Sequence, residues 1–129
     1  MQLKPAGKKK DKNKSNDYKM DWIEKLDGSV IVTDLGGKVI YANSMAEGTF
    51  VKPGEPSLIG RDLMDCHNEN SKKIIGRIME EKIKNVYTIE KKGKKKLIYQ
   101  TPWIVEGELK GLVELSLEIP FNMPHFVRE

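Results

Sequence analysis

The side chains best suited to chemistry in this sequence are the thiol of Cys66 and the imidazole of His67, which are neighbours in the chain. A neutral imidazole is a common metal ligand, and a thiol can bind a metal or act as a redox sensor. Successive side chains usually diverge, so the pair cannot be assumed to meet at one site. Both also have structural interpretations, with Cys66 buried as a small apolar residue and His67 capping or packing at a helix start.

Enzymatic chemistry is not indicated elsewhere in the chain. The other histidine, His125, lies near the C-terminus between Pro124 and Phe126. The sequence contains no Gly-x-Ser-x-Gly motif, no Walker-type phosphate loop and no cluster of Cys and His with metal-ligand spacing. Gly36-Gly37 is typical of a turn and not of a phosphate-binding loop. We therefore expect no enzymatic activity.

The first 20 residues carry most of the positive charge. They hold seven lysines and two aspartates, whereas the net charge of all 129 residues is +4, so the remainder is close to neutral. The length suits one domain, which we expect over residues 17–126, preceded by a disordered lysine-rich leader over residues 1–16. Alternatively the leader contacts an anionic surface such as nucleic acid, with an affinity that falls steeply with salt.

The sequence does not favour export or a membrane. Cys66 is the only cysteine, which excludes an intramolecular disulfide and agrees with a reducing cytoplasm. No apolar run approaches the length of a membrane span, and the N-terminus lacks the apolar core of a signal peptide. We expect a cytoplasmic protein that makes no membrane contact.

The elements that must position these side chains begin with a hairpin. Residues 29–33 are a β-branched run, and residues 34–43 fit a tight turn and a second strand that ends at Asn43. The Asp34 side chain can accept a hydrogen bond from the backbone two residues on, and Gly37 supplies a positive φ at the turn.

Helices are predicted on both sides of this hairpin. Residues 17–26 fit a short helix with one apolar face, formed by Tyr18, Trp22 and Leu26. Residues 44–50 fit another, capped by Asn43 or Ser44, before a loop over residues 51–58 that contains two prolines.

A longer central helix is predicted to start at residues 68–71, capped by an asparagine or by Ser71. Gly76 lies in its middle, and either permits a close approach of the sheet or a ligand, or is a tolerated defect. The apolar stripe of this helix consists of Ile74, Ile75, Ile78, Met79 and Ile83.

Three strand-like runs follow the central helix. Residues 85–91 form the first and residues 97–105 the second, in which Pro102 marks an edge or a bulge because it cannot donate to a ladder. Apolar and polar residues alternate strictly over residues 113–119, and this period of two indicates a sheet with one buried face.

The order of these motifs resembles a PAS domain. Asp34, Gly37 and Asn43 have the spacing of the opening PAS hairpin, and residues 58–67, with Gly60, are similar to the segment that leads into the PAS central helix. The resemblance covers roughly residues 22–119. It implies an α+β fold, with an antiparallel sheet of about five strands and helices inserted between strands 2 and 3. It also implies a non-catalytic sensory or interaction module that binds a small ligand or a protein partner.

A pocket between the central helix and the sheet is the default ligand site in such a fold. Each candidate for its lining has plain core packing as the alternative, and the candidates are His67, Ile74, Ile75, Ile78, Met79, Tyr99, Trp103 and Leu115.

The resemblance also raises the question of a cofactor. In the haem-binding branch of the PAS family an imidazole of the central helix binds iron, and His67 lies at the entrance of that helix, so a haem-based gas or redox sensor is one alternative. We expect no haem, because bulky side chains such as Ile78 and Met79 take up pocket volume. The flavin-photoreceptor branch uses an Asn-Cys-Arg-Phe-Leu-Gln motif that this chain lacks, so flavin is not supported.

Partners are expected on two grounds. The Tyr18, Trp22 and Leu26 face favours a homodimer, since symmetric dimers are the commonest oligomers. No kinase, cyclase or DNA-binding segment follows residue 119. A whole gene product would therefore act through a separate output protein, whereas an excised fragment would have lost its output domain, and the sequence leaves both open.

Overall fold

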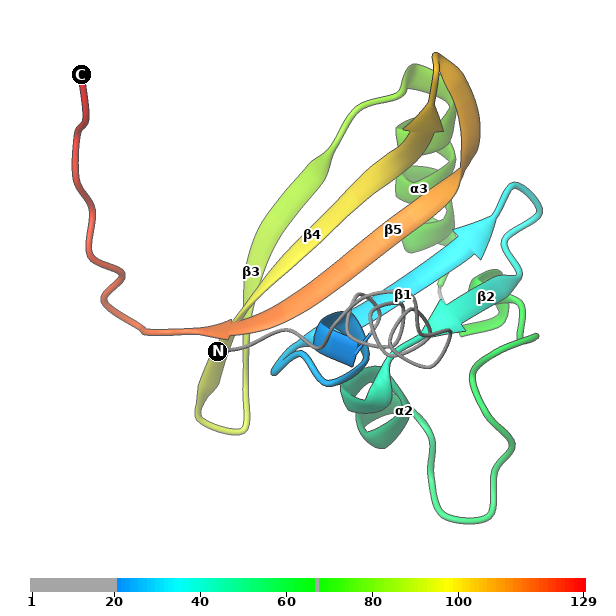
Figure 1. Cartoon of the computed structure of the whole chain (residues 1–129), viewed down its shortest axis with the longest axis horizontal. Coiled ribbons are helices and arrows are strands. Elements are labelled where there is room, and N and C mark those ends of the chain that lie inside the picture. Colours follow the sequence, from blue (N-terminus) through cyan, green and yellow to red (C-terminus); the bar gives the residue numbers. More distant parts are fainter. Residues whose placement is uncertain (1–20, 67) are drawn as a thin grey trace, which may run out of the picture.

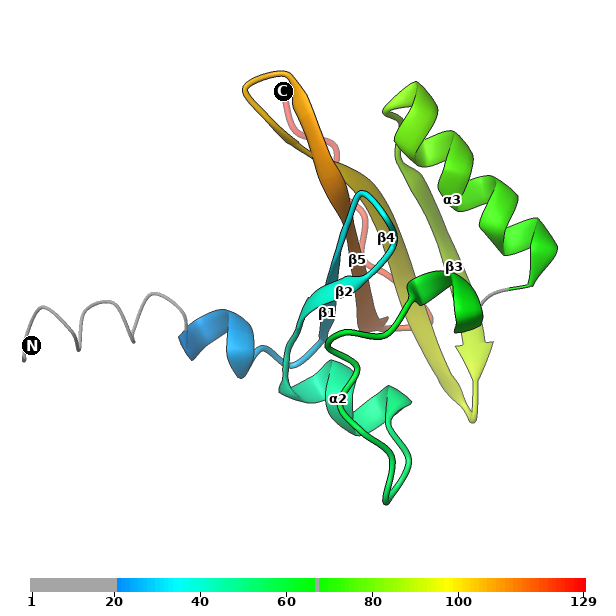
Figure 2. The ribbon, with the colours of Figure 1, turned by 90° about the vertical axis from the view of Figure 1, so that its right-hand side faces the viewer.

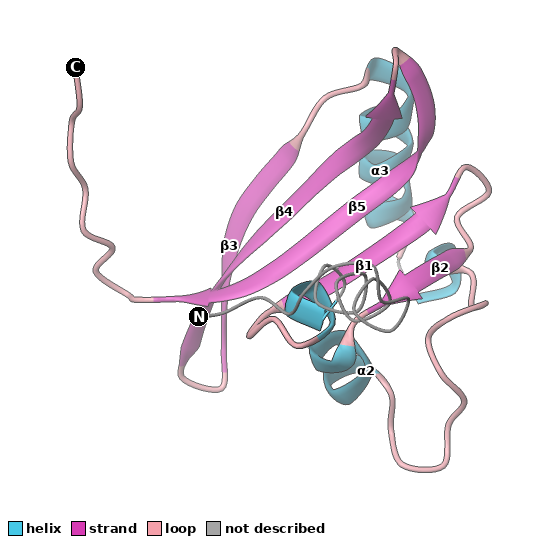
Figure 3. Ribbon diagram, in the orientation of Figure 1, coloured by secondary structure: helices cyan, strands magenta, loops and turns pink. Residues whose placement is uncertain are grey.

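Five antiparallel strands form one sheet in the computed structural model, which describes residues 21–66 and 68–129 (Figure 1). Their spatial order is β2-β1-β5-β4-β3. The strands are β1 (Ser29–Asp34), β2 (Val39–Ala42), β3 (Asn85–Lys91), β4 (Lys94–Val105) and β5 (Glu108–Ile119). Between β2 and β3 come α2 (Ser44–Phe50), the 3-10 helix η1 (Leu63–Cys66) and α3 (Glu69–Glu81). Figure 3 shows the helices and strands in separate colours. The expected sheet and its inserted helices are confirmed.

The β1–β2 turn forms through the side chain and backbone predicted for it. Asp34 Oδ1 accepts hydrogen bonds from the backbone N–H groups of Gly36, at 3.0 Å, and Lys38, at 2.9 Å. Gly37 has a φ of 87°, which a residue with a Cβ rarely adopts. Local turn chemistry therefore fixes the register of this hairpin.

The two predicted helices that follow β2 both begin at an asparagine. Asn43 caps α2 and accepts from the backbone N–H of Ala46, and Asn68 caps α3 and accepts from the backbone N–H of Ser71 at 2.8 Å. The helix α3 ends at Glu81 because Lys82 adopts a left-handed conformation, with a φ of 55°. Ile83 therefore lies beyond the helix and is not part of its stripe, contrary to the prediction.

Gly76 is exposed on α3, and a Cβ built on it would meet no atom within 4 Å. The hypothesis that this glycine permits a close approach of the sheet or a ligand is therefore wrong. It is a tolerated interruption of the helix.

Pro102 lies inside β4 without interrupting it. The pairing of β3 with β4 ends at Asn85 opposite Gln100, so Pro102 lies where β4 has only β5 as a neighbour. A bulge follows immediately, between Trp103 and Ile104. The missing N–H is thus located where one side of the strand has no partner, as the prediction of an edge or bulge requires.

The helices α2 and α3 cover one face of the sheet (Figure 2). At the end formed by β1 and β2, which we call the α2 end, one apolar cluster contains Ile31, Val39, Ala42, Ala46 and Leu58. Under the C-terminal half of α3 a second cluster contains Leu63, Ile75, Ile78 and Leu112, with Ile74 and Met79 packed against it.

Candidate functional site

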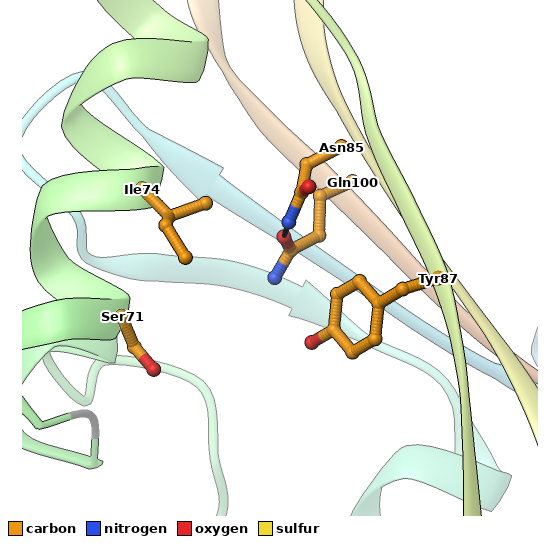
Figure 4. A pocket seen from close by; sticks show the side chains of 5 residues that line it. All are labelled: Ser71, Ile74, Asn85, Tyr87 and Gln100. Atoms are coloured by element: carbon orange, nitrogen blue, oxygen red, sulfur yellow. Dashed lines mark hydrogen bonds between the residues drawn. The ribbon is translucent and has the colours of Figure 1, made fainter.

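A pocket of about 390 Å³ lies between α3 and the outer strands β3 and β4 (Figure 4). We call this part of the covered face the pocket end. Ser71 and Ile74 reach the pocket from α3, Asn85 and Tyr87 from β3, and Gln100 from β4. Four of these five side chains carry a hydrogen-bonding group, so a few polar groups converge on a pocket whose surface is otherwise apolar.

A hydrogen-bonded chain of side chains runs across the sheet beside this pocket. The Asn85 amide nitrogen donates to Gln100 Oε1 at 2.8 Å, and the Gln100 amide nitrogen donates to Glu114 Oε2 at 2.6 Å. Asn85 pairs directly with Gln100, and Gln100 with Glu114, so the three side chains stand in a row on three adjacent strands. We call Asn85, Gln100 and Glu114 the polar ladder.

The carboxylate of Glu114 sets the direction of the polar ladder. An ionised carboxylate can only accept, so Gln100 must turn its amide nitrogen toward Glu114 and its carbonyl oxygen toward Asn85. Asn85 must then present its amide nitrogen to Gln100. Gln100 is only 4% exposed, whereas Asn85 and Glu114 are half-buried. The centre of the ladder is therefore shielded from solvent, and its two ends are partly accessible.

Tyr87 stands one pleat along β3 from Asn85, on the same face, and its side chain reaches into the pocket in Figure 4. Burial raises the pKa of its phenol, and the negative charge of Glu114 raises that pKa further. The neutral hydroxyl is therefore the form at ordinary pH, available both to donate and to accept.

Solved structures with the same architecture include two signalling domains. A sensory box sensor histidine kinase from Vibrio cholerae has 12% identity and a TM-score of 0.58, and covers 88% of this chain and 98% of its own. The PAS domain of the histidine kinase ThkA has 21% identity and a TM-score of 0.55, and covers 69% of this chain and 97% of its own. This chain has a PAS-like fold. The resemblance stated from the hairpin and helix motifs is thereby confirmed at the level of the fold.

VqmA of Vibrio cholerae, solved with its ligand and DNA, has the same fold over part of its length, with 14% identity and a TM-score of 0.60. The match covers 78% of this chain and 50% of VqmA, so the chain spans about half of that protein. No protein-family model matches the sequence, and neither does any curated protein.

Of the eight residues predicted to line a PAS pocket, Ile74 lines this one. Ile75 and Ile78 are buried in the apolar cluster beneath α3, and Met79 packs against that cluster. His67 lies outside the described residues, so its role as a haem ligand or a helix-entrance residue stays a prediction.

Tyr99, Trp103 and Leu115 lie on the opposite face of the sheet, and the prediction that they line a pocket under the central helix is corrected. Tyr99 neighbours Gln100 along β4, and Leu115 neighbours Glu114 along β5, so each points away from the polar ladder. The alternation over residues 113–119 predicts one buried face without saying which face the helices cover. The register puts its polar set, which includes Glu114, on the same face as Leu112, the face that the helices cover.

The other four residues of the pocket wall were not predicted because none belongs to the apolar stripe of the central helix, and they are Ser71, Asn85, Tyr87 and Gln100. A signal was nevertheless present, because Gln100 interrupts a strand whose neighbours are apolar or β-branched. A buried amide in such a strand needs a partner, and cross-strand pairing supplies one on each side.

The predicted motif residues Asn43 and Gly60 are structural. The Asn43 side chain is fully buried and makes four hydrogen bonds to the backbone, accepting from Val30 and Ala46 and donating to Ile23 and Gly28. Gly60 has a φ of 95°, and its N–H donates to the Val39 carbonyl at 2.8 Å. Both residues fasten the connections around β2 to the sheet.

Within residues 21–66 and 68–129 no group of three or more His, Cys, Asp or Glu side chains is arranged to hold a metal ion. In the same part of the chain, no helix combines the length and apolar character needed to cross a membrane.

Proposed function

We propose that this PAS-like domain is a non-catalytic sensory module that binds a small ligand in the pocket beneath α3. The observation that carries the proposal is the polar wall of that pocket, made by Ser71, Asn85, Tyr87 and Gln100. A pocket of about 390 Å³ with a few convergent polar groups has the character of a small-molecule site. Sensor kinases share this fold, and so does VqmA, which was solved with its ligand. These similarities support a sensory function for this domain.

The polar ladder offers a route from ligand to sheet. Its hydrogen bonds join the edge strand β3 to β4 and β5, so a ligand that re-pairs Asn85 changes the partners of Gln100 and Glu114 as well. A ligand with different affinities for two arrangements of the ladder shifts their populations. A separate signalling protein, or a further domain, would respond to that shift.

Ligand capture tests the proposal. The protein is incubated with a metabolite extract, and bound small molecules are detected by native mass spectrometry. Ser71→Phe places a ring in the pocket from α3, and Thr49→Phe places the same ring on the exposed surface of α2 as a control. We expect an adduct with the wild type and Thr49→Phe and none with Ser71→Phe. No wild-type adduct, or an equal adduct with Ser71→Phe, would contradict the proposal.

A second proposal is a homodimer built on the segment before β1. Trp22 is 63% exposed, an unusual placement for so large an apolar side chain, and Leu26 is half-buried near it, while Tyr18 lies outside the described residues. Light scattering on Trp22→Ala and Leu26→Ala tests the dimer. We expect a dimeric wild type and weakened association in both variants, and a monomeric wild type at working concentration would exclude it.

The remaining expectations concern residues outside the described part of the chain, and they stay proposals. If the lysine-rich leader binds nucleic acid, affinity should fall steeply with salt and disappear on deletion of residues 1–16. If His67 bound haem, purified protein would absorb strongly near the violet edge, and His67→Ala would abolish this band. We propose that the purified protein is colourless, because it binds no haem, and that the protein is cytoplasmic.

A further inference from the structure

Glu114 brings a negative charge to the polar ladder without a neutralising cation. Its carboxylate accepts a hydrogen bond from Gln100, and none of the ion pairs among the described residues involves it. By contrast, Glu118, four residues further along β5, faces Lys94 at 3.7 Å. A half-buried anion beside a pocket stabilises positive charge or N–H donors in that pocket and opposes a second anion.

The wall of the pocket is rich in acceptors once the ladder is made. Asn85 uses one of its two amide N–H groups on Gln100 and keeps its carbonyl oxygen as an unused acceptor, and Glu114, next to the wall, keeps its second carboxylate oxygen. The hydroxyl groups of Ser71 and Tyr87 can each accept as well as donate. The negative charge of Glu114 decides between the two directions, because it favours a ligand edge that donates over one that accepts.

The shape of the pocket adds a second constraint. The Tyr87 ring and the Ile74 side chain reach into the space from opposite sides, one from β3 and one from α3 (Figure 4). Its volume of about 390 Å³ is near the lower limit of the range for ligand pockets, roughly 300–1,000 Å³. A flat molecule of one or two rings fits between an aromatic and an aliphatic wall.

We propose that the pocket selects its ligand by charge, taking a small planar molecule that is neutral or cationic and carries N–H donors, and rejecting carboxylates and phosphates. This inference rests on the proposed function, because it assumes that the pocket is a ligand site. Amidines, carboxamides and protonated or amino-substituted heterocycles belong to the accepted class.

Three probes of one shape test the selection: benzamidine is a cationic donor, benzamide a neutral donor and benzoate an anion. Titrations are followed by NMR through the side-chain amide signals of Asn85 and Gln100, which report on the pocket wall. We expect benzamidine and benzamide to shift both signals. Benzamidine should bind at least about tenfold more tightly than benzoate, the scale of one charge-assisted hydrogen bond.

Glu114→Gln removes the charge while keeping an acceptor oxygen and the side-chain length. In this variant the ratio of benzoate to benzamidine dissociation constants should fall toward one. Glu118→Gln removes the same charge from the same strand at an exposed site paired with Lys94, so it should leave the ratio unchanged.

The outcomes separate this inference from the proposed function. Benzoate binding as tight as benzamidine, or a ratio unchanged in Glu114→Gln, would overturn charge selection while leaving a ligand pocket in place. If none of the three probes shifts the Asn85 and Gln100 signals, the ligand class is wrong. The native mass spectrometry of the wild type and Ser71→Phe then decides independently whether the pocket binds any ligand.

Discussion

The two ends of the helix-covered sheet face use the same amide chemistry in opposite ways. At the α2 end the Asn43 amide makes all four of its hydrogen bonds to backbone groups. At the pocket end Asn85 and Gln100 bond to side chains, in a chain that finishes at Glu114. Backbone partners cannot be exchanged without moving strands, whereas side-chain partners can rotate. The α2 end is therefore fixed, and the pocket end can change partners.

The two ends also differ in burial, and this difference agrees with the difference in hydrogen bonding. Asn43 has no exposed surface, and an apolar cluster lies next to it around Ile31 and Ala46. Asn85 and Glu114 are half-buried, so water can replace a lost ladder bond. We conclude that a lost hydrogen bond costs much more stability at the α2 end than at the pocket end, and this difference can be measured.

The largest effect is expected for Asn43→Ala. The substitution removes the cap of α2 and leaves the N–H of Val30 and the carbonyls of Ile23 and Gly28 without the partner they have in the native protein. We expect the free energy of unfolding to fall by roughly 3 kcal/mol or more, since each unpaired buried group costs about 1–3 kcal/mol. Urea denaturation with an unchanged m value would measure it.

Asn68→Ala is the matched control for this substitution. Asn68 also caps a helix but is exposed, and its side chain accepts from the backbone N–H of Ser71. Its loss should cost only about 1 kcal/mol, the usual value of a helix cap. Equal losses for the two asparagines would show that Asn43 is no more than a cap.

A smaller effect of opposite sign is expected for Gly76→Ala in α3, the helix that roofs the pocket. The added methyl group meets no atom within 4 Å and removes the helix-weakening effect of glycine. We expect stability to rise by about 0.5–1 kcal/mol in urea denaturation. Gly60→Ala is the control and should destabilise, because Gly60 has a φ of 95°. A destabilised Gly76→Ala would mean that α3 needs its glycine.

The next prediction is a near-zero effect on stability for Gln100→Leu at the pocket end. Asn85 and Glu114 lose their partner, but both are half-buried and can bond to water, while the leucine adds apolar surface beneath α3. We expect the free energy of unfolding to change by less than about 1 kcal/mol. A loss as large as that of Asn43→Ala would remove the contrast between the two ends.

The sequence predicted the parts of this fold that depend on local chemistry. The Asp34 turn, the asparagine caps and the bounds of β3 all follow from residues close together in the chain. The pocket wall depends instead on register, since a shift of one residue turns a whole strand over. The apolar residues Val113, Leu115 and Leu117 favour burial of one face of β5. Glu114 lies on the opposite face, and only the pairing of β5 with β4 places it beside Gln100.

The subtlest prediction concerns how the ladder acts on Tyr87. Burial is the larger cause of its raised pKa and the Glu114 carboxylate the smaller, so Glu114→Gln should lower the pKa of Tyr87 but leave it above the ordinary value of 10.0. Because the folded-state pKa is the higher one, the stability contributed by the neutral phenol is complete below pH 10.0 and declines as the pH rises through the folded value. NMR titration of tyrosines labelled at Cζ would follow each phenol separately.

Tyr41 is the internal reference for this titration. Burial and the hydrogen bond to Glu24 raise its pKa to about 12, and it lies at the α2 end, away from the ladder. Its titration should therefore be the same in the wild type, Glu114→Gln and Glu118→Gln. If Tyr87 titrates identically in all three proteins, Glu114 does not act on the pocket electrostatically, and the ladder contributes geometry alone. If only Glu114→Gln moves Tyr87, the charge of the ladder is felt inside the pocket, which is the property that ligand selection requires.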